Sequence, residues 1–490
     1  MNILNFRSNR NLNAYKISLN IKKFIDSWTN QTYIKNLIKK LSYISKIPTN
    51  ILSYEIKQIL SGNFRFSEGK FTNKLALKST VYDALIFFSL LTYSMIFSKS
   101  NFKKKNFNII VDDVEQEDQA ERFSKVLKLS KNSALICKKK VIFKKENSEK
   151  FNIVRNDVFK IYNKNFFIGI KFKLFLFFFH ILFISIKNNL NLFFIFNKLF
   201  YKIIDSETLF SKVNSKVLIT DRFYRTSAIK NYIFKRNGGL ITSCIQKNIC
   251  EFSISFFINI DIFFSLGKNY PVLLKKLGCK IKKFVPVGSL FMEAMWHEQK
   301  KDLKKVPSSD VLIIGLNYAN APERMYIDKA HYEIYYEHID WLKKISNKYP
   351  KLNIILKHHG NCKLDFKEQK ILENSTVQTI YKSPSINFSY AFIHKAKQIY
   401  SFGSTMILES MSINKPSYFL DPRLKNISFH KSIPKAKKIR IKNYNIFEKL
   451  VVSNLKKQKH KKIKSTDSLC LKSDKVSIKI VNFLKKKNYI

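Results

Sequence analysis

The chain of 490 residues is too long for one ordinary domain, and its hydrophobic content of 45% is enough to bury two or three cores. Its formal net charge of +54 suits an anionic membrane or an anionic substrate. The lysines are dispersed, and no zinc-finger spacing or aromatic RNA-binding motif accompanies them, which argues against a nucleic-acid partner.

The cysteines and the N-terminal sequence predict a cytoplasmic protein. The six cysteines form no CxxC pair and no zinc spacing, so we expect reduced thiols and no metal site. The chain starts without a signal-peptide pattern. We expect no cofactor.

Residues 1–100 are predicted to form a basic, mostly helical region. Two apolar segments stand out, 84–97 and 174–200, and the uninterrupted apolar runs in them are shorter than the ~20 residues that span a membrane. Both are expected to be buried core or interfacial helices. Peripheral contact with an anionic membrane, on its cytoplasmic face, therefore stays open.

Strands alternating with helices begin at Phe107. The predicted strands of the first run are 107–113, 133–137, 216–221, 240–246, 261–267 and 282–289, with helices at 116–129, 224–239 and 270–278. A Phe- and Lys-rich segment at about 150–210 interrupts this run and is predicted to be an insertion or a hydrophobic flap. Residues 290–309 lack strand character and are predicted to be a linker.

A second run of alternation follows the linker. Its predicted strands are 310–317, 352–359, 376–381, 397–403 and 417–421, with helices at 321–349, 387–396 and 404–415. Two such runs predict an α/β protein with two Rossmann-like, doubly wound domains facing a cleft. The expected divisions are 1–100, 101–292, 310–425 and a basic C-terminal tail or helix at 426–490.

Ligands of such folds bind beyond the carboxyl ends of the strands. Gly403, Ser404 and Thr405 lie at a predicted strand-to-helix turn, where free N–H groups and hydroxyls suit a phosphate; plain helix capping explains them equally well. Glu409 shares a helix face with Thr405 and suits ribose hydroxyls, or is a solvated acid. Lys357 precedes His358 and His359 at another strand end, and at most one histidine of the pair faces the ligand side.

The first run ends its strands in polar residues too. Asp221 and Arg222 end one strand, Gln246 another, and Gly288 and Ser289 the last. An acid such as Asp221 suits a general base for an acceptor hydroxyl, or caps the next helix. A competing acidic cluster, Asp112, Asp113 and Glu115, follows the first strand.

The stretch SFGSTMILESMSINKPSYFLDP, residues 401–422, resembles the donor-site segment of GT-B glycosyltransferases. FKRNGGLITSCIQ, DIFFSLGKNYPVLLKKLG, VPVGS and ILKHHG resemble members that build bacterial surface and capsule polysaccharides. The resemblance spans about 216–422. It implies an N-terminal acceptor domain, a C-terminal nucleotide-sugar domain and metal-independent transfer.

Carried over by position, Ser404 and Thr405 hold the donor phosphate, Glu409 the ribose or sugar, and His359 the phosphate edge. Ser401 occupies the position where many retaining members carry a second glutamate, so the stereochemistry stays open. Lys247 follows Gln246 where related sequences often read Gln-His-Gly.

The predicted function is therefore transfer of a sugar from a nucleotide-activated donor to a lipid-linked or glycan acceptor in surface polysaccharide biosynthesis. Asp221 and His359 are the catalytic candidates. Lys357 joins residues 403–405 and Glu409 on the donor side, and the acceptor side comprises Arg222, Gln246, Gly288 and Ser289. The alternatives are transfer of an acidic sugar or polyol phosphate from a CMP or CDP donor, a UDP-sugar epimerase, and a non-enzymatic scaffold on a membrane surface.

Overall fold

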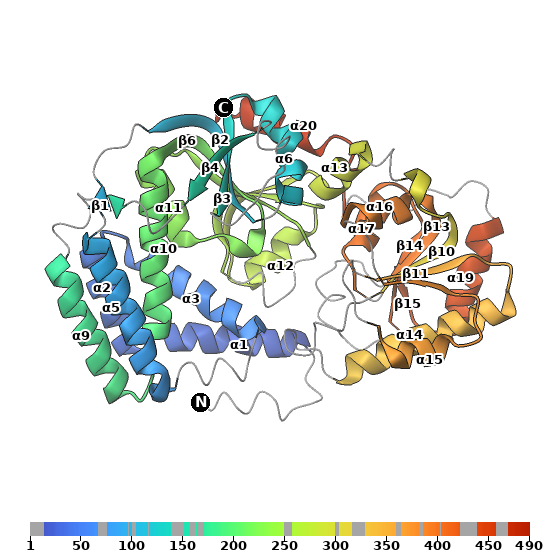
Figure 1. The fold of residues 1–490 in the computed structure, drawn as a ribbon, viewed down its shortest axis with the longest axis horizontal. Helices are drawn as coiled ribbons and strands as arrows, with labels where there is room; N and C mark the ends of the chain where they lie inside the picture. Colours follow the sequence, from blue (N-terminus) through green and yellow to red (C-terminus); the bar gives the residue numbers. More distant parts are fainter. Residues whose placement is uncertain are drawn as a thin grey trace.

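The computed structural model shows two parallel β-sheets flanked by helices, with a further layer of helices at one end of the molecule (Figure 1). The structure describes residues 14–66, 76–96, 98–99, 104–115, 117–138, 151–156, 162–163, 171–248, 257–298, 303–315, 329–358, 364–381, 386–401, 403–421, 439–456 and 469–490.

The first sheet has seven parallel strands. In spatial order they are β4 (Asn152–Asn156), β3 (Ser133–Lys138), β2 (Lys105–Val114), β6 (Val213–Thr220), β7 (Ile241–Ile245), β8 (Asn259–Ser265) and β9 (Lys280–Pro286). Ile109 and Val111 of β2 pack into one core, and Ile110 between them packs into another. Successive side chains of a strand point to opposite faces, so a strand covered on both faces is apolar at every position.

The second sheet has six parallel strands. In spatial order they are β12 (Gln378–Ile380), β11 (Ile354–Lys357), β10 (Ser309–Ile314), β13 (Ala396–Ser401), β14 (Ser417–Leu420) and β15 (Arg440–Ile441). Val311 and Ile313 of β10 face one core and Leu312 faces another. The same apolar run thus buries both faces of this central strand.

Both sheets begin with the same winding. Numbered along the chain, the first six strands of each run in the order 3-2-1-4-5-6, which is the doubly wound Rossmann order. The predicted α/β fold class is confirmed. The order reverses between β2 and β6 in the first sheet and between β10 and β13 in the second, and ligands of such sheets bind at this switch point.

Helices cover both sheets. Those associated with the first sheet are α6 (Glu117–Ser130), η3 (Phe223–Arg225), α11 (Ala228–Arg236), α12 (Tyr270–Lys276), α13 (Leu290–Glu298) and α20 (Val476–Lys486). Those associated with the second are η4 (Leu303–Lys305), α14 (Lys329–Lys348), α15 (Phe366–Leu372), α16 (Ile386–Lys395), α17 (Met406–Ser412) and α19 (Tyr444–Lys456).

One of these helices was not predicted from the sequence, and the packing position of a second was not predicted. Residues 290–309, expected to be a linker, start with α13, which packs on α6 and α20 because Leu290 and Met292 enter the core. The C-terminal α20 returns to the first sheet and buries Val476 and Ile480 against α6. The C-terminal α20 thus packs on the first sheet, whereas α19 packs on the second.

The N-terminal residues and the later part of the predicted insertion form one helical layer, whereas residues 152–156 of that insertion form β4, the edge strand of the first sheet, which was not predicted. The helices of the layer are α1 (Ala14–Thr29), α2 (Thr32–Ser45), α3 (Thr49–Phe66), η2 (Leu77–Ser79), α5 (Thr80–Ile96), α9 (Lys171–Lys187) and α10 (Phe193–Lys212), with a two-stranded pair, β1 (Ser98–Lys99) and β5 (Tyr162–Asn163), beside it. Helix α10 contacts α5, α3 and α11, and α3 also contacts α11. Within the described ranges no helix has both the length and the apolar character that crossing a bilayer requires.

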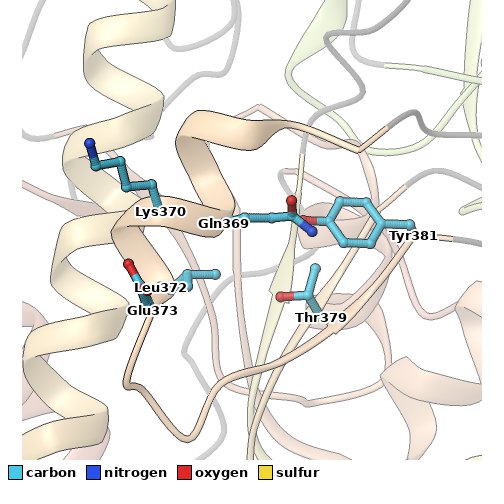
Figure 2. A pocket seen from close by; sticks show the side chains of 6 residues that line it. All are labelled: Gln369, Lys370, Leu372, Glu373, Thr379 and Tyr381. Carbon is cyan, nitrogen blue, oxygen red and sulfur yellow. The ribbon is translucent and has the colours of Figure 1, made fainter.

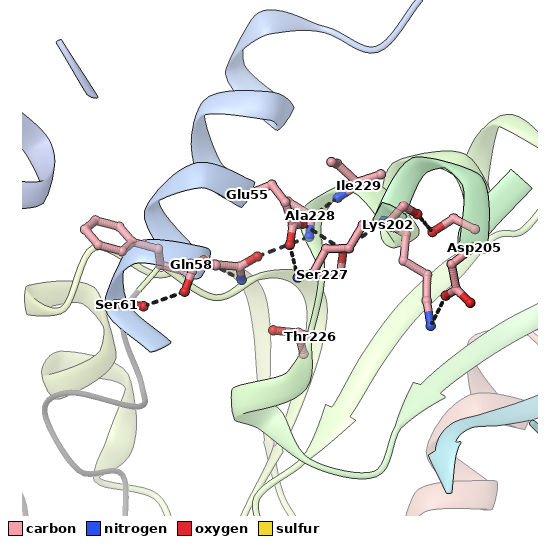
Figure 3. Close-up of polar contacts among 12 residues, drawn as sticks. Glu55, Gln58, Ser61, Lys202, Asp205, Thr226, Ser227, Ala228 and Ile229 are labelled. Carbon is pink, nitrogen blue, oxygen red and sulfur yellow. Dashed lines mark hydrogen bonds and ion pairs between the residues drawn. The ribbon is translucent and has the colours of Figure 1, made fainter. Parts of the chain in front are cut away.

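Glu55 of α3 joins this layer to the first sheet (Figure 3). Its carboxylate accepts hydrogen bonds from Ser227 Oγ at 2.7 Å and Ile229 N at 3.0 Å, and pairs with Lys202 of α10. Gln58 accepts from Ala228 N at 3.3 Å. Side chains of α3 therefore satisfy the N-terminal N–H groups of α11, which have no partner within that helix.

Candidate functional site

At the switch point of the second sheet, a buried serine links the ends of the two central strands by a hydrogen bond. Ser401, the last residue of β13, donates its hydroxyl to the carbonyl of Ile314 at the end of β10, with an oxygen–oxygen distance of 2.8 Å. The same hydroxyl accepts from the backbone N–H of Ser404 at 3.3 Å. Ser401, at the position where a second acid was considered, therefore fixes the turn that follows β13.

The turn at Gly403, Ser404 and Thr405 leads directly into α17. All three residues are half-buried. Ser404 Oγ accepts a hydrogen bond from Met406 N at 3.2 Å. Thr405 occupies the N-cap position of α17, and its side chain makes no capping hydrogen bond. The turn thus lies at the carboxyl end of β13, beside the switch point, as the sequence predicted.

Glu409 lies one turn further into α17 and is buried, with 2% of its surface exposed. Its two carboxylate oxygens accept hydrogen bonds from Ser289, which follows β9 of the first sheet, and from Tyr390 Oη of α16 at 3.0 Å. Burial raises the pKa of Glu409 although these two hydrogen bonds and the positive charges of Lys247 and Arg122 act to lower it. A residue that the sequence predicted for the donor side and one that it predicted for the acceptor side are thus in direct contact.

Four further side chains from helices and loops of the first sheet lie near this contact. Arg122 of α6 lies 3.5 Å from the carboxylate of Asp221, and its guanidinium lies 3.7 Å from the ring centroid of Phe291. Lys247 Nζ lies 4.9 Å from the same centroid. We call Arg122, Asp221, Lys247, Ser289, Phe291, Tyr390 and Glu409 the intersheet cluster.

The intersheet cluster unites three predicted site residues, Asp221, Ser289 and Glu409. Arg222 borders it, with Nε 3.5 Å from a carboxylate oxygen of Asp221. Arg122, Phe291 and Tyr390 were not predicted. Arg122 carried a usable signal, because this chain uses far fewer arginines than lysines and a guanidinium suits a buried ion pair better than an ammonium.

The acidic residues at the carboxyl end of β2 form internal ion pairs. Asp112 pairs with Lys230 at 2.8 Å and Asp113 with Arg225 at 3.0 Å. Burial lowers the pKa of Lys230, but the charges of Asp112 and Asp205 outweigh it, so the pKa is raised and the ammonium stays charged. These contacts hold β2, α10 and α11 together.

Gln246 and Gly288, both predicted for the acceptor side, contact neighbouring loop and C-terminal residues. Gln246 accepts from Leu266 N at 3.0 Å and donates to the carbonyl of Asn248 at 3.0 Å, which fixes the loop after β7. Gly288 has φ +99°, and a Cβ there would lie 2.9 Å from Ser473 Oγ. The C-terminal segment therefore passes close to the residue that precedes Ser289.

The histidine strand end forms a separate group. Lys357 is buried and donates its amine to the carbonyl of His358. His358 contacts Glu368 Oε1 at 2.9 Å, and its ring stacks on Tyr381 with centroids 4.9 Å apart. Burial acts to raise the pKa of Glu368, but hydrogen bonds from His358 and its neighbours lower it. The other histidine, His359, lies outside the described residues.

Two hollows flank these groups. One of about 480 Å³ lies beside α15 and β12 and is lined by Gln369, Lys370, Leu372, Glu373, Thr379 and Tyr381 (Figure 2). A smaller one of about 210 Å³ lies between α6, α13 and α20 and includes Arg122 in its wall. The smaller hollow adjoins the intersheet cluster, whereas the larger one adjoins the histidine strand end.

Comparisons with known proteins found similarity only in structure. No family model matches the chain, and no curated protein matches it in sequence. A UDP-GlcNAc 2-epimerase from Neisseria meningitidis bound to UDP-GlcNAc is 12% identical with a TM-score of 0.48, covering 78% of this chain and 100% of its own. The S. aureus MnaA–UDP structure is 14% identical with a TM-score of 0.46, covering 78% and 98%.

The wall teichoic acid polymerase TagF is a further similar structure, 8% identical with a TM-score of 0.39 and covering 84% of this chain and 95% of its own. Identities and TM-scores of this size do not establish an activity for this chain. The fold itself follows from the strand order of this chain.

Proposed function

We propose that the protein is a GT-B-like transferase that moves a sugar from a nucleotide-activated donor to a lipid-linked or glycan acceptor. The observation that carries the proposal is the contact between Ser289 and Glu409. Each residue follows the carboxyl end of a strand in a different doubly wound sheet, so the ligand-binding edges of both sheets converge on the intersheet cluster. Two substrates bound at these edges would meet there.

The donor phosphate is proposed to bind at Ser404 and Thr405, where backbone N–H groups and hydroxyls precede α17. Arg122 and Lys247 supply positive charge near the point where the leaving phosphate develops negative charge. Asp221 is the proposed base for the acceptor hydroxyl, with Arg122 beside it. His359 remains a candidate for the phosphate edge, and Glu409 is proposed to align α17 with the first sheet, because protein donors already bind both of its oxygens.

The test is the double variant Ser404→Ala and Thr405→Ala. We expect donor turnover to fall by about 10²–10³-fold, because the transition-state phosphate loses two donors in a partly dehydrated site. The melting temperature should fall slightly, because Met406 N loses its acceptor at Ser404 Oγ. Donor hydrolysis and transfer are measured together with thermal unfolding. Ser453→Ala is the control, since Ser453 also makes one local hydrogen bond but lies on α19. Unchanged turnover in the double variant would contradict the assignment.

A sugar-nucleotide epimerase is the second candidate. The presence of two acids in the intersheet cluster, Asp221 and Glu409, favours it, because epimerisation by proton removal and return needs groups that exchange protons. Thermal shifts with UDP, GDP, CDP and CMP compounds identify the nucleotide, and also separate the CMP- or CDP-dependent transferases. Turnover of a UDP-sugar without any acceptor would select the epimerase.

A further inference from the structure

Helices α5 and α9 expose an unusually apolar surface. Val81, Tyr82, Leu85 and Phe88 of α5 and Phe175, Leu176, Phe179, Phe183 and Ile186 of α9 are all exposed, and we call this set the apolar face. The exposed fraction is 71% for Tyr82 and 63% for Phe183. Scattered exposed apolar residues are ordinary, but nine on two packed helices form a patch that marks an interaction site.

The orientation of the apolar face is fixed by the core. On α9, Phe175, Phe179, Phe183 and Ile186 recur at helical spacing and share one side. The opposite sides of both helices are buried, and Phe87 of α5 packs on Phe178 of α9 with ring centroids 6.2 Å apart. The helices therefore cannot rotate to bury the exposed side without disrupting this packing.

The rim of the apolar face is basic. Lys173 and Lys187, near the two ends of α9, are exposed. Three further lysines are also exposed: Lys78 before α5, Lys40 in α2 and Lys46 directly after α2. Lys173 lies over the ring of Tyr43, with Nζ 4.8 Å from the centroid. The exposed positions of both helices in the described range carry no acid, and Asp83 of α5 is half-buried and accepts a hydrogen bond from Asn191 at 2.6 Å.

We propose that the apolar face binds an anionic lipid bilayer, with α5 and α9 lying in the headgroup region. Apolar side chains surrounded by lysines are complementary to acyl chains beneath anionic headgroups. A second copy of the chain is the less suitable occupant, because a two-fold contact would bring the rim lysines of both copies together. The inference depends on the apolar face and its basic rim and not on the proposed activity.

The position of the face in the molecule agrees with this role. Figure 1 shows α2, α5 and α9 together at one end, with the second sheet at the other. Docking through the apolar face would hold the first sheet, which carries the proposed acceptor side, nearer to the bilayer than the second sheet. A lipid-linked acceptor would then have the shorter path to its site.

The test is flotation of the full chain with vesicles of phosphatidylglycerol and phosphatidylcholine, and with phosphatidylcholine alone. The unmodified chain should float with the anionic vesicles and much less with the neutral ones. The double variant Phe179→Ser and Phe183→Ser should lower the partition coefficient at least about tenfold, and Lys173→Gln with Lys187→Gln should weaken binding to anionic vesicles only.

The matched control is Leu364→Ser with Phe366→Ser, which removes two exposed apolar side chains beside the second sheet and should leave flotation unchanged. Circular dichroism verifies that each variant is folded. Unchanged flotation of the Phe179 and Phe183 variant would overturn the proposal. So would light scattering that shows a dimer in the unmodified chain and a monomer in this variant, with no vesicle binding in either.

Discussion

Glu409 is the residue at which the two sheets meet, and its environment favours the neutral acid. Burial raises its pKa above the ordinary value of 4.5, although Ser289 and Tyr390 donate to it and Lys247 and Arg122 lie near enough to act on its charge. In the native protein the proton is therefore retained at pH values where the unfolded chain has released it. The stability that this carboxyl group contributes is complete below its ordinary pKa and is lost as the pH rises through the raised value.

We expect Glu409→Gln to remain folded and to remove this pH dependence. A glutamine is neutral at every pH, so the melting temperature of the variant relative to the unmodified chain should increase as the pH rises above the ordinary pKa of 4.5 and through the raised value. Thermal unfolding followed by circular dichroism across this range measures the difference. A constant difference, or one of opposite sign, would contradict a raised pKa.

Glu409→Ala separates the hydrogen bonds from the charge. This variant leaves the hydroxyls of Ser289 and Tyr390 without their acceptor, and we expect the free energy of unfolding to fall by about 1–3 kcal/mol. Urea unfolding of the alanine and glutamine variants side by side provides the control, because only the alanine variant loses both acceptor positions.

The sequence predicted the position of Glu409 but not its partners. Its helix and its place one turn after Thr405 follow from spacing within a short segment. Ser289 is 120 residues away, and Tyr390 belongs to a different helix. Which side chains meet between two sheets depends on how the sheets pack, and a local pattern contains no information on that packing.

At the scale of elements, the contact of α3 with α11 couples the helical layer to the first sheet. Glu55 is buried and accepts from Ser227, from Ile229 N and from Lys202. We expect Glu55→Ala to lower the free energy of unfolding by about 2–4 kcal/mol, because it leaves an ammonium group and two N–H or O–H donors without their acceptor. Denaturant unfolding measures the loss.

Glu55→Gln is the matched control for that experiment. The amide keeps an acceptor oxygen for Ser227 or Ile229 but removes the negative charge that faces Lys202, so its loss should be smaller than that of alanine. Equal losses in both variants would show that the charge, and not the capping of α11, dominates this junction. No loss in either would contradict the role of Glu55 in docking the layer.

Elements with a clear hydrophobic pattern were predictable from sequence. β6, β7, β8 and β13 fall within a few residues of their predicted positions, because parallel strands covered on both faces are continuous apolar runs. β15 has only two residues, Arg440 and Ile441, too few to show any periodicity. α13 was missed because polar residues follow it closely, and its burial is decided by α6 and α20, which lie far away in the sequence.

At the scale of the whole molecule, the chain connects the two sheets twice. The first connection runs from β9 to β10. The second follows α19 and leads back to α20 on the first sheet, and its residues 469–475 pass beside Gly288. Leu471 N donates to the carbonyl of Leu266 at 2.8 Å, and Ser289 N donates to Ser473 Oγ at 2.9 Å. This return of the chain was not predictable, since 426–490 shows charge runs and no strand alternation.

Gly288→Ala tests whether this second connection stabilises the molecule. A Cβ at Gly288 would lie 2.9 Å from Ser473 Oγ and 3.0 Å from the carbonyl oxygen of Leu471, at a φ of +99° that alanine rarely adopts. Gly238 offers a matched control, because its φ of +93° is similar while a Cβ there would meet only Asn214 Oδ1 at 3.9 Å. Backbone strain alone should cost both alanine variants about 1–3 kcal/mol of unfolding free energy.

Gly288→Ala should lower the free energy of unfolding by more than Gly238→Ala does. The additional loss arises because the new Cβ must also displace the C-terminal segment from Gly288, the residue next to Ser289. Limited proteolysis should then cut this variant faster between α19 and α20 than the Gly238→Ala variant, since the segment is held less often against the first sheet. Equal unfolding free energies and equal cleavage rates would mean that the contact beside Gly288 does not hold the second connection in place. A larger loss in Gly288→Ala would identify it as one of the contacts that align Ser289 with Glu409.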